Sequence, residues 1–239
     1  MPRLDVFLTK SGLIESRQRA QALILAGKVQ VAGATERRPD RAVREDEVIT
    51  VDESPGYASR GALKLGPALD HFQVDPTARV CADIGASTGG FTDVLLRRGA
   101  AKVFAVDVGR GLIHWRLRQD PRVVVIERVN ARDLESFPEP VSLVVADLSF
   151  ISLEKVLPAV RQAAHEAEVV ALFKPQFEVG KAEVGKGGIV RDQLVIEAAL
   201  QRFRTWCGGN GYNVAGEAPS ELTGAEGNQE YFFHLRPVA

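Results

Sequence analysis

Charged residues close five apolar runs of this 239-residue chain. The runs read VCAD, VFAVD, VVVIE, LVVAD and VVALFK, and they end at Asp83, Asp107, Glu127, Asp147 and Lys174. A lysine at the end of a buried strand is unusual, because an ammonium group is costly to bury unless it is paired or loses its proton. Carboxylates and a desolvated lysine are groups that exchange protons in catalysis. The pattern therefore predicts an active-site rim.

The spacing of these runs predicts how the chain positions the charged groups. Each interval is long enough for a strand and a crossover helix, which is typical of an α/β fold with a mainly parallel sheet and covered faces. The carboxyl ends of parallel strands share one edge, and ligands bind outside that edge. The segment QEYFFHLRP predicts a closing strand that carries Glu230 beside the other charges.

The segment DIGASTGGFTDVLL follows the first of these strands and predicts a cofactor loop. Glycines in such a turn let the backbone approach a ligand and direct amides toward it. The segment lacks both the G-x-G-x-x-G pattern of dinucleotide sites and the Gly-Lys-Ser/Thr of a phosphate-binding loop. Asp107 ends the next strand, where a carboxylate can accept both hydroxyl protons of a ribose.

A nucleoside cofactor without a pyrophosphate suits this combination, and we expect S-adenosylmethionine. Asn130 and Ala131 follow the third strand and are expected near the adenine. The predicted cofactor-binding residues are Asp83, Gly85, Ala86, Ser87, Gly89, Gly90, Phe91, Asp107, Asn130, Ala131 and Asp147. The alternative is a tight turn beside a solvent-facing aspartate, but the repeated acids at strand ends favour a binding site.

The composition limits the class of protein. With 45% apolar and 26% charged residues, the chain can form one large domain and one small one. Charges interrupt its first residues, unlike a secretory signal, and no run approaches the ~20 apolar residues of a membrane span. Cys81 and Cys207 are isolated, so we expect packed, reduced thiols and a cytoplasmic location. The histidines show no ligand spacing, and we expect no metal.

Positive charge is concentrated near the N-terminus. The first 44 residues hold nine lysines and arginines against four acids, although the net charge of the chain is −1. Ser16 predicts the start of a helix that ends at Gly27, and KVQVAG and DEVITVDE predict short strands. Clustered positive charge suits a nucleic-acid backbone, with an ordinary solvated face as the alternative. These cations include Arg3, Lys10, Arg17, Arg19 and Lys28.

Longer motifs resemble known families. The segment RLDVFLTKSGLIESRQRAQALILAGKVQVAG resembles the S4 RNA-binding domain, and the chain from YASRGALKL to NQEYFFHL resembles the FtsJ-like ribose methyltransferases. With DIGASTGGFTD, ADLSF, LFKPQFEVG and GGIVRD, the whole chain is similar to the TlyA (haemolysin A) family. The resemblance implies an α+β S4-like RNA-binding domain over residues 1–50, a linker over 51–61, and a Rossmann-like class I methyltransferase domain over 62–239 with a mainly parallel seven-stranded sheet.

The resemblance also implies an activity, the methylation of cytidine ribose 2′-hydroxyls in ribosomal RNA, with ribosomal subunits as partners. The RNA-binding residues expected from it are Arg3, Lys10, Arg17, Arg19, Lys28 and Arg60. Its catalytic tetrad falls on Lys64, Asp147, Lys174 and Glu230. Methyl transfer to a hydroxyl needs a base, and a lysine is one only when burial or a neighbouring cation lowers its ordinary pKa of about 10.4. Lys174 is the expected base, Lys64 the neighbouring cation, and the acids orient the lysines or the methyl donor. Ala62 stands where the family pattern has a second glycine.

Several alternatives stay open. Lys64 and Glu230 can be solvated surface residues, and Asp147 can cap a helix that starts near Leu153. A catalytically inactive RNA-binding or ribosome assembly factor and a membrane-active haemolysin-like protein are the competing functions. DNA is no substrate if a 2′-hydroxyl is the acceptor. Trp115 can pack near the cofactor or in the core, and we expect the core. Residues 178–192 predict either a lid or a flexible surface loop.

Overall fold

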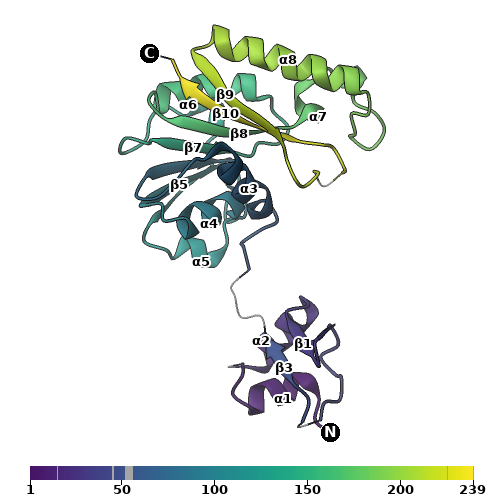
Figure 1. Ribbon diagram of the computed structural model, residues 1–239. Helices are drawn as coiled ribbons and strands as arrows, with labels where there is room; N and C mark the ends of the chain where they lie inside the picture. The colour runs from purple at the N-terminus through teal and green to yellow at the C-terminus, as the bar shows by residue number, and fades with distance from the viewer. Residues whose placement is uncertain (15, 45, 52–55, 225, 239) are drawn as a thin grey trace. The chain divides into compact units, whose positions relative to one another are not determined.

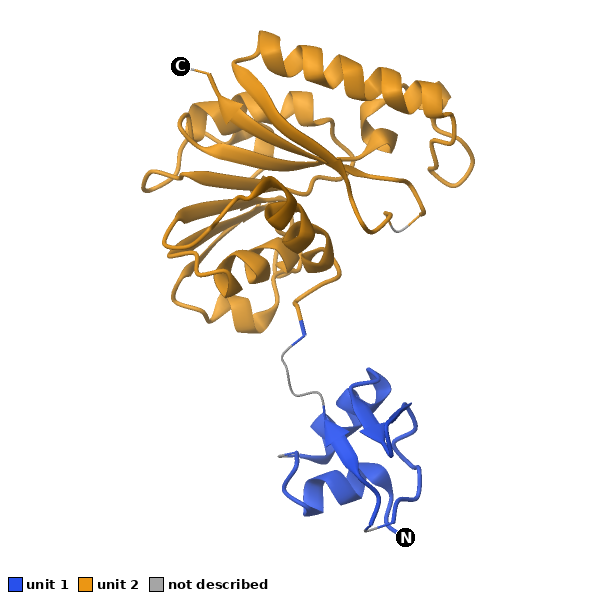
Figure 2. Cartoon of the chain, in the orientation of Figure 1, with its two compact units in different colours: residues 1–56 blue, residues 57–239 orange. Residues whose placement is uncertain are grey.

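The computed structural model describes residues 1–14, 16–44, 46–51, 56–224 and 226–238. The chain divides into two compact units, Met1–Gly56 and Tyr57–Ala239 (Figure 2). The boundary between the units falls within the predicted linker, residues 51–61. Residues 52–55 of that linker lie outside the described part, and residues 57–61 belong to the larger unit.

The N-terminal unit is a small α+β fold. It contains α1 (Leu4–Lys10), α2 (Arg17–Leu25) and an antiparallel sheet in the order β2-β1-β3, with β1 (Val29–Val31), β2 (Ala34–Glu36) and β3 (Ile49–Val51). Ser16 caps α2 by accepting a hydrogen bond from the Arg19 amide at 3.3 Å, and Gly27 follows the helix with a φ of +72°. Both features agree with the sequence prediction. The buried aliphatic core of this unit is small, which limits its stability.

The larger unit is built on a seven-stranded sheet in the order β6-β5-β4-β7-β8-β10-β9 (Figure 1). The first five strands in this order are parallel, whereas β10 is antiparallel to β8, and β9 to β10. The mainly parallel α/β prediction is therefore confirmed. The strands are β4 (Val80–Ile84), β5 (Lys102–Asp107), β6 (Val123–Glu127), β7 (Leu143–Ala146), β8 (Glu168–Phe173), β9 (Tyr212–Pro219) and β10 (Tyr231–Pro237).

Helices cover both faces of this sheet (Figure 1). One apolar core packs α3 (Ala62–Phe72), α4 (Gly90–Arg97) and α5 (Trp115–Arg118), and the other packs α6 (Leu157–Ala163) and α8 (Gln193–Gly209). Adjacent residues of one strand serve different cores, as Val144 and Val145 do on β7. Strands buried on both faces therefore read as continuous apolar runs. Short elements complete the unit: α7 (Pro175–Glu178), η1 (Ala131–Asp133), η2 (Leu153–Lys155) and η3 (Lys181–Glu183).

Two single-residue predictions have different outcomes. Cys81 and Cys207 are buried free thiols, as expected. Trp115 is 65% exposed, so its predicted core position is wrong. Leu117 takes the buried side of α5 instead, because positions two apart on a helix point in nearly opposite directions. The ring of Trp115 stacks on His114, with 5.9 Å between centroids.

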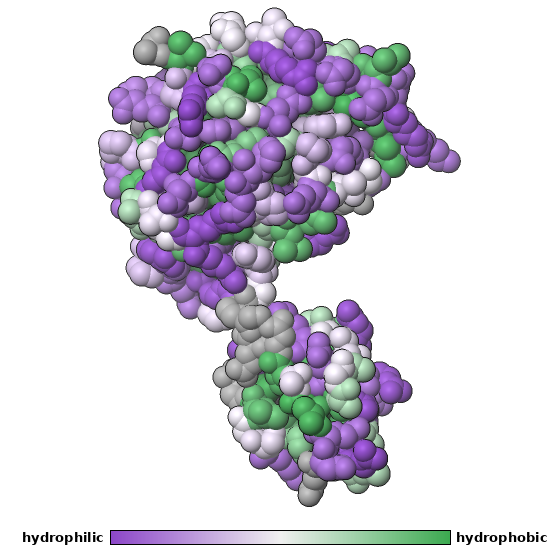
Figure 3. Space-filling view, viewed as in Figure 1, coloured by the Kyte–Doolittle hydropathy of each residue, from purple (hydrophilic) through white to green (hydrophobic). Residues whose placement is uncertain are grey.

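The surface and the helices bear on the membrane alternative. The visible face of the larger unit is mainly hydrophilic, with scattered apolar patches (Figure 3). Among the helices of the described residues, none is long and apolar enough to cross a bilayer.

Candidate active site

The carboxyl-terminal edge of the sheet collects the predicted tetrad. Asp147 and Lys174 directly follow β7 and β8, which are parallel neighbours. Because β10 is antiparallel to β8, its first residue, Tyr231, pairs with Phe173 at the end of β8. Glu230 immediately precedes Tyr231 and therefore lies at the same edge as Lys174.

The tetrad forms two lysine–carboxylate pairs. Lys174 Nζ lies 2.6 Å from Asp147 Oδ1 and donates a hydrogen bond to Ser149 Oγ at 3.1 Å. The contact with Asp147 is an ion pair rather than an aligned hydrogen bond. Lys64 Nζ, from the first turn of α3, donates a hydrogen bond to Glu230 Oε2 at 2.6 Å. Both lysine side chains are nearly buried, at 11% exposed for Lys174 and 13% for Lys64, so each pair is largely shielded from water.

Ala62, the departure from the family pattern, does not displace Lys64. Ala62 is the first residue of α3 and is buried, without a positive φ that would require glycine. The close approach at this point is made by Gly90 of α4. A Cβ on Gly90 would lie 3.0 Å from the Ala62 amide nitrogen and would clash with Ser59 Oγ. Gly90 therefore lets the start of α3 pack against the start of α4.

The other two glycines of the predicted cofactor loop also serve packing. Gly85 and Gly89 have φ values of +84° and +93°, which disfavour residues with a Cβ. A Cβ on Gly85 would clash with the Asp147 carbonyl, and one on Gly89 would clash with Leu117. Gly85 thus brings the loop after β4 against Asp147, while Gly89 receives α5. The close contacts that these glycines permit are with the chain itself.

Asp83 is the fourth of the five residues of β4 rather than the last, but it lines the same pocket as Asp147 and Lys174. The side chain is fully buried, and Oδ2 accepts hydrogen bonds from the Thr92 amide at 2.8 Å and the Thr92 hydroxyl at 2.7 Å. Oδ1 is a buried oxygen that receives no hydrogen bond. Burial raises the pKa of Asp83 to about 7, with small further contributions from the negative charges of Asp147 and Asp107.

Asp107 and Glu127 do end their strands, and both bind backbone amides. Asp107 accepts from the amides of Ser87 at 2.8 Å and Gly109 at 2.7 Å. Glu127 accepts from the Gly111 amide at 2.7 Å and pairs with Arg118, and these bonds, chiefly that of Arg118, lower its pKa. Because each carboxylate oxygen has two lone pairs, Asp107 can still accept ribose hydroxyls.

Three pockets meet at Ser149. The donor pocket, of about 820 Å³, contains Asp107, Asn130 and Ala131 with apolar Leu112 and Val129. The central pocket, of about 290 Å³, contains Lys64, Asp83, Asp147 and Lys174 and the loop residues Gly85, Ala86, Ser87, Gly90 and Phe91. The loop pocket, of about 450 Å³, contains Lys64, Lys174 and Glu230 with Phe150 and Phe177.

The residues that line the donor and central pockets fit S-adenosylmethionine, the expected cofactor. The donor pocket has a volume typical of small-molecule sites, an acid at the ribose position and apolar side chains for a nucleobase. The carboxylate of Asp147 gives the central pocket negative character, which suits a sulfonium, and a bound cation would favour the ionised form of Asp83, whose Oδ1 has no hydrogen bond. The described residues contain no cluster of three His, Cys, Asp or Glu side chains that could hold a metal ion.

Phe150 is a candidate site residue that the sequence analysis missed. It is 91% exposed, has a φ of +66° and contacts Phe177 of α7 with 5.2 Å between ring centroids. A phenylalanine in a left-handed conformation has a strained backbone, and an exposed one leaves its apolar ring in water. Such strained residues cluster at functional loops. The only signal in the sequence is an aromatic residue in the short segment DLSFIS that follows a strand.

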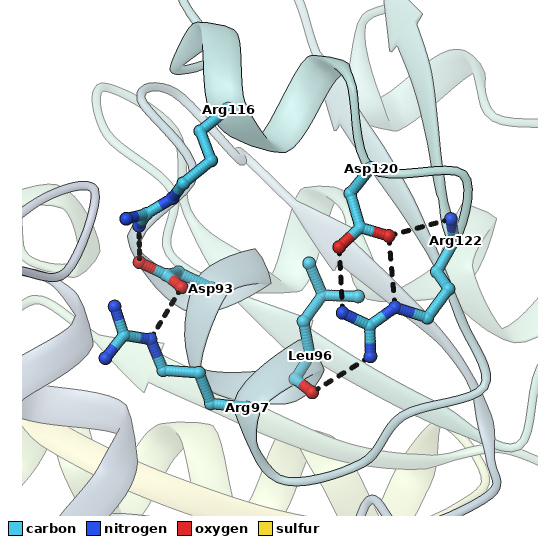
Figure 4. Close-up of polar contacts among 6 residues, drawn as sticks. All are labelled: Asp93, Leu96, Arg97, Arg116, Asp120 and Arg122. Atoms are coloured by element: carbon cyan, nitrogen blue, oxygen red, sulfur yellow. Dashed lines mark hydrogen bonds and ion pairs between the residues drawn. The ribbon is translucent and has the colours of Figure 1, made fainter. Parts of the chain in front are cut away.

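Asp93 holds the surrounding elements together. It accepts hydrogen bonds from Arg97 at 2.9 Å and from Arg116 of α5 at 2.9 Å (Figure 4). It also accepts one from the Ala58 amide at 2.8 Å. The residues after Ala58 lead into α3 and include Arg60, which lines the central pocket. Asp93 thus fixes the chain segment that delivers Lys64. In the same view, Arg122 binds Asp120 and the Leu96 carbonyl.

The predicted RNA-binding residues fall into two groups. Arg60 lines the central pocket of the larger unit. Arg3, Lys10, Arg17, Arg19 and Lys28 belong to the N-terminal unit. Within that unit, Arg3 and Arg17 share one carboxylate, that of Asp5.

Comparison with known proteins places this site in a family. The chain is 49% identical over 239 residues to the 16S/23S rRNA (cytidine-2′-O)-methyltransferase TlyA of Mycobacterium tuberculosis, covering 98% of this chain and 89% of that protein. It is 40% identical to Hemolysin A of Brachyspira hyodysenteriae, covering 98% and 99%. A solved structure of a candidate hemolysin from Streptococcus thermophilus superposes with a TM-score of 0.76 at 40% identity, covering 99% and 88%.

Family matches divide the chain in the same way as its fold. The S4 domain matches residues 2–49, and the FtsJ-like methyltransferase matches residues 57–237. The second match spans more than half of the chain and includes both lysine–carboxylate pairs. It confirms the predicted methyltransferase and, with it, the S-adenosylmethionine cofactor. The chain therefore belongs to the FtsJ-like methyltransferase family and carries an S4 domain at its N-terminus.

Proposed function

We propose that this protein methylates the ribose 2′-hydroxyl of cytidine in ribosomal RNA. The observation that carries the proposal is the convergence of Lys64–Glu230 and Lys174–Asp147 where the donor, central and loop pockets meet. The named activity of the Mycobacterium tuberculosis relative supports the ribose 2′-oxygen as the acceptor atom and cytidine as the nucleoside. RNA in ribosomal subunits would be the partner, DNA lacks the reacting hydroxyl, and the proposal places the protein in the cytoplasm with the ribosomes.

Lys174 is the proposed general base. S-adenosylmethionine, when bound, supplies a methyl group on a sulfonium, and transfer breaks the carbon–sulfur bond. Lys174 Nζ takes the proton from the 2′-hydroxyl while the hydroxyl oxygen forms its bond to the methyl carbon. This step needs the neutral amine, so Lys174 must first give up the proton with which it pairs with Asp147. Asp147 and Ser149 orient Nζ toward the acceptor, since both contact it in the structure.

Lys64 and Glu230 form the second proposed working pair. Glu230 is 3% exposed and holds Lys64 Nζ in place by a 2.6 Å hydrogen bond. Because Glu230 neutralises most of the charge on Lys64, the pair can hold the acceptor by hydrogen bonds without strongly repelling a cationic methyl donor. The pair lines the loop pocket, where we place the acceptor nucleoside.

Phe150 and the N-terminal unit supply the proposed RNA contacts. An exposed aromatic ring beside the loop pocket is a platform on which an unstacked base can lie. Stacking does not distinguish bases strongly, so the S4 unit would contribute affinity and positioning through the RNA backbone. Shape of the folded RNA then determines which nucleotide reaches Lys174.

Substitution of the proposed base tests this function. Lys174→Ala should reduce methylation of ribosomal RNA at least about a hundredfold, the usual effect of losing a general base. Affinity for S-adenosylmethionine, measured by calorimetry, should stay nearly unchanged. Lys102→Ala is the matched control, because Lys102 begins β5 at the opposite edge of the sheet and pairs with Glu139. Mass spectrometry of the modified nucleotides would identify the acceptor, and retained turnover in Lys174→Ala would contradict the role of base.

The names of two similar proteins favour one alternative, a membrane-lytic activity. Release of dye from liposomes by the purified chain tests it directly. Leakage that persists in Lys174→Ala would show a second activity that does not depend on the methyltransferase site.

A further inference from the structure

Asp5 is the centre of a polar cluster in the N-terminal unit. Its side chain is 0% exposed. Oδ1 accepts a hydrogen bond from Arg3 Nε at 3.1 Å, while Oδ2 accepts from Arg17 Nε at 3.0 Å and from Gln21 Nε2 at 2.7 Å. Asp5 is on α1, Arg17 and Gln21 are on α2, and Arg3 precedes α1. One carboxylate therefore gathers side chains from three segments of the chain.

The cluster keeps Asp5 ionised and stays positive overall. Burial alone would raise the pKa of Asp5, but hydrogen bonds from the two arginines and Gln21 hold it well below its usual range. A single carboxylate lies against two guanidinium groups, so the cluster carries one net positive charge. An ionised acceptor also fixes the arginine side chains more firmly than a neutral one.

The two guanidinium groups keep donors for another ligand. Their side chains are 49% exposed for Arg3 and 55% for Arg17. Each guanidinium has five N–H donors, and the contacts with Asp5 use two on Arg3 and one on Arg17. A guanidinium fork matches phosphate geometry, and a side chain that is already ordered loses less entropy when it binds.

We propose that Asp5 is a positioning residue for RNA binding, which holds Arg3 and Arg17 side by side as a paired site for neighbouring backbone phosphates. The proposal rests on the proposed function, because it takes structured RNA as the ligand. The proposed effect of Asp5 on RNA affinity is opposite to the one that net charge alone predicts. An acid near an RNA backbone should weaken binding, whereas positioning makes this acid strengthen it.

The test compares two aspartates in the full-length protein. Affinity for a fluorescein-labelled RNA hairpin with a paired stem is measured by anisotropy over a range of salt concentrations. Asp5→Asn should weaken binding about tenfold and make the salt dependence shallower by about one to two released ions. Asp40→Asn is the control, because Asp40 is exposed and acts on Arg3 through charge alone. It should bind equally or more tightly, and the same result in Asp5→Asn would overturn the proposal.

A second comparison shows whether Asp5 acts through the arginines. In a protein that already carries Arg3→Gln and Arg17→Gln, adding Asp5→Asn should change the RNA affinity less than twofold. A further tenfold loss in that background would overturn the positioning role.

Hydrogen exchange of the amides in residues 1–51 reports whether Asp5→Asn still folds. If it does not, Arg17→Lys carries the test at unchanged net charge. Lysine lacks the Nε donor that contacts Asp5, so binding should weaken several-fold, and unchanged binding would overturn the proposal. Failure of the unaltered protein to bind the hairpin would instead contradict the proposed function.

Discussion

Among the described residues, each unit of the molecule buries one aspartate completely, and the two carboxylates are in opposite states. Asp5 and Asp83 are both 0% exposed. Asp5 accepts from two guanidinium groups and an amide, which hold its pKa below the usual range. Asp83 accepts from the amide and hydroxyl of Thr92, and its second oxygen has no hydrogen bond, so burial raises its pKa to about 7.

The comparison teaches that the partners of a buried acid decide its charge. Asp5 lies in a small unit with little protein around it, whereas Asp83 is in β4, between β5 and β7 in the middle of the sheet. The nearest charges also differ, because Asp83 faces two other acids, Asp107 and Asp147. A cation in the central pocket would favour the ionised form of Asp83. The charge of this residue therefore depends on what occupies the site, whereas that of Asp5 is fixed by the fold.

The largest expected effect is on the stability of Asp83→Asn. A folded pKa of about 7, above the unfolded value of about 3.9, means that stability is greatest below pH 4, falls between pH 4 and pH 7 and stays low above pH 7. At pH 8 the penalty is about 3 to 4 kcal/mol at 1.36 kcal/mol per pH unit. Asparagine removes the charge, so the variant should be more stable than the unaltered protein at pH 8 by about 3 to 4 kcal/mol. Urea unfolding followed by tryptophan fluorescence measures it, since both tryptophans lie in the larger unit.

The pH dependence separates this cause from a simple change in packing. The two stability curves should converge toward pH 4, where Asp83 is protonated in both folded and unfolded chains. Curves that stay parallel from pH 4 to 8 would show that ionisation of Asp83 contributes nothing.

Glu178 extends the comparison to a partly buried acid and a smaller effect. Its Oε1 accepts from the Leu153 amide at 2.8 Å, and burial raises its pKa to about 7. Because its side chain keeps some contact with water, we discount the penalty at pH 8 to about 1 to 2 kcal/mol. Glu178→Gln keeps the acceptor for Leu153 and should gain that stability at pH 8. No gain would indicate that Glu178 is ionised at low cost.

How far the sequence predicts this site depends on where each charge lies along the chain. Asp147 and Lys174 end uninterrupted apolar runs, so the sheet edge follows directly from the pattern. VCAD looks like the same pattern, but Ile84 continues the strand and places Asp83 in the interior. An apolar residue also follows Asp107 and Asp147, so only the extent of β4 in the structure shows that Asp83 lies inside the strand.

The pairing of the tetrad required the order of the strands. Lys64 and Glu230 are far apart in the sequence and meet because β10 lies antiparallel to β8 and begins at the active-site edge. The sequence does not indicate β9, because asparagine, glycine and glutamate interrupt the apolar residues of its segment YNVAGEAP. Phe150 depends on a left-handed backbone conformation that no periodicity indicates.

The smallest expected effect has the opposite sign and gives the sharpest form of the comparison. Asp5→Asn should lower the stability of the N-terminal unit by about 1 kcal/mol at pH 7, since it weakens hydrogen bonds to two half-exposed arginines. A folded pKa below the unfolded value makes this contribution present above about pH 4 and lost as the pH falls further. Amide exchange in residues 1–51 should therefore be faster in the variant at pH 7. Slower exchange would mean that Asp5, like Asp83, is stabilised by losing its charge.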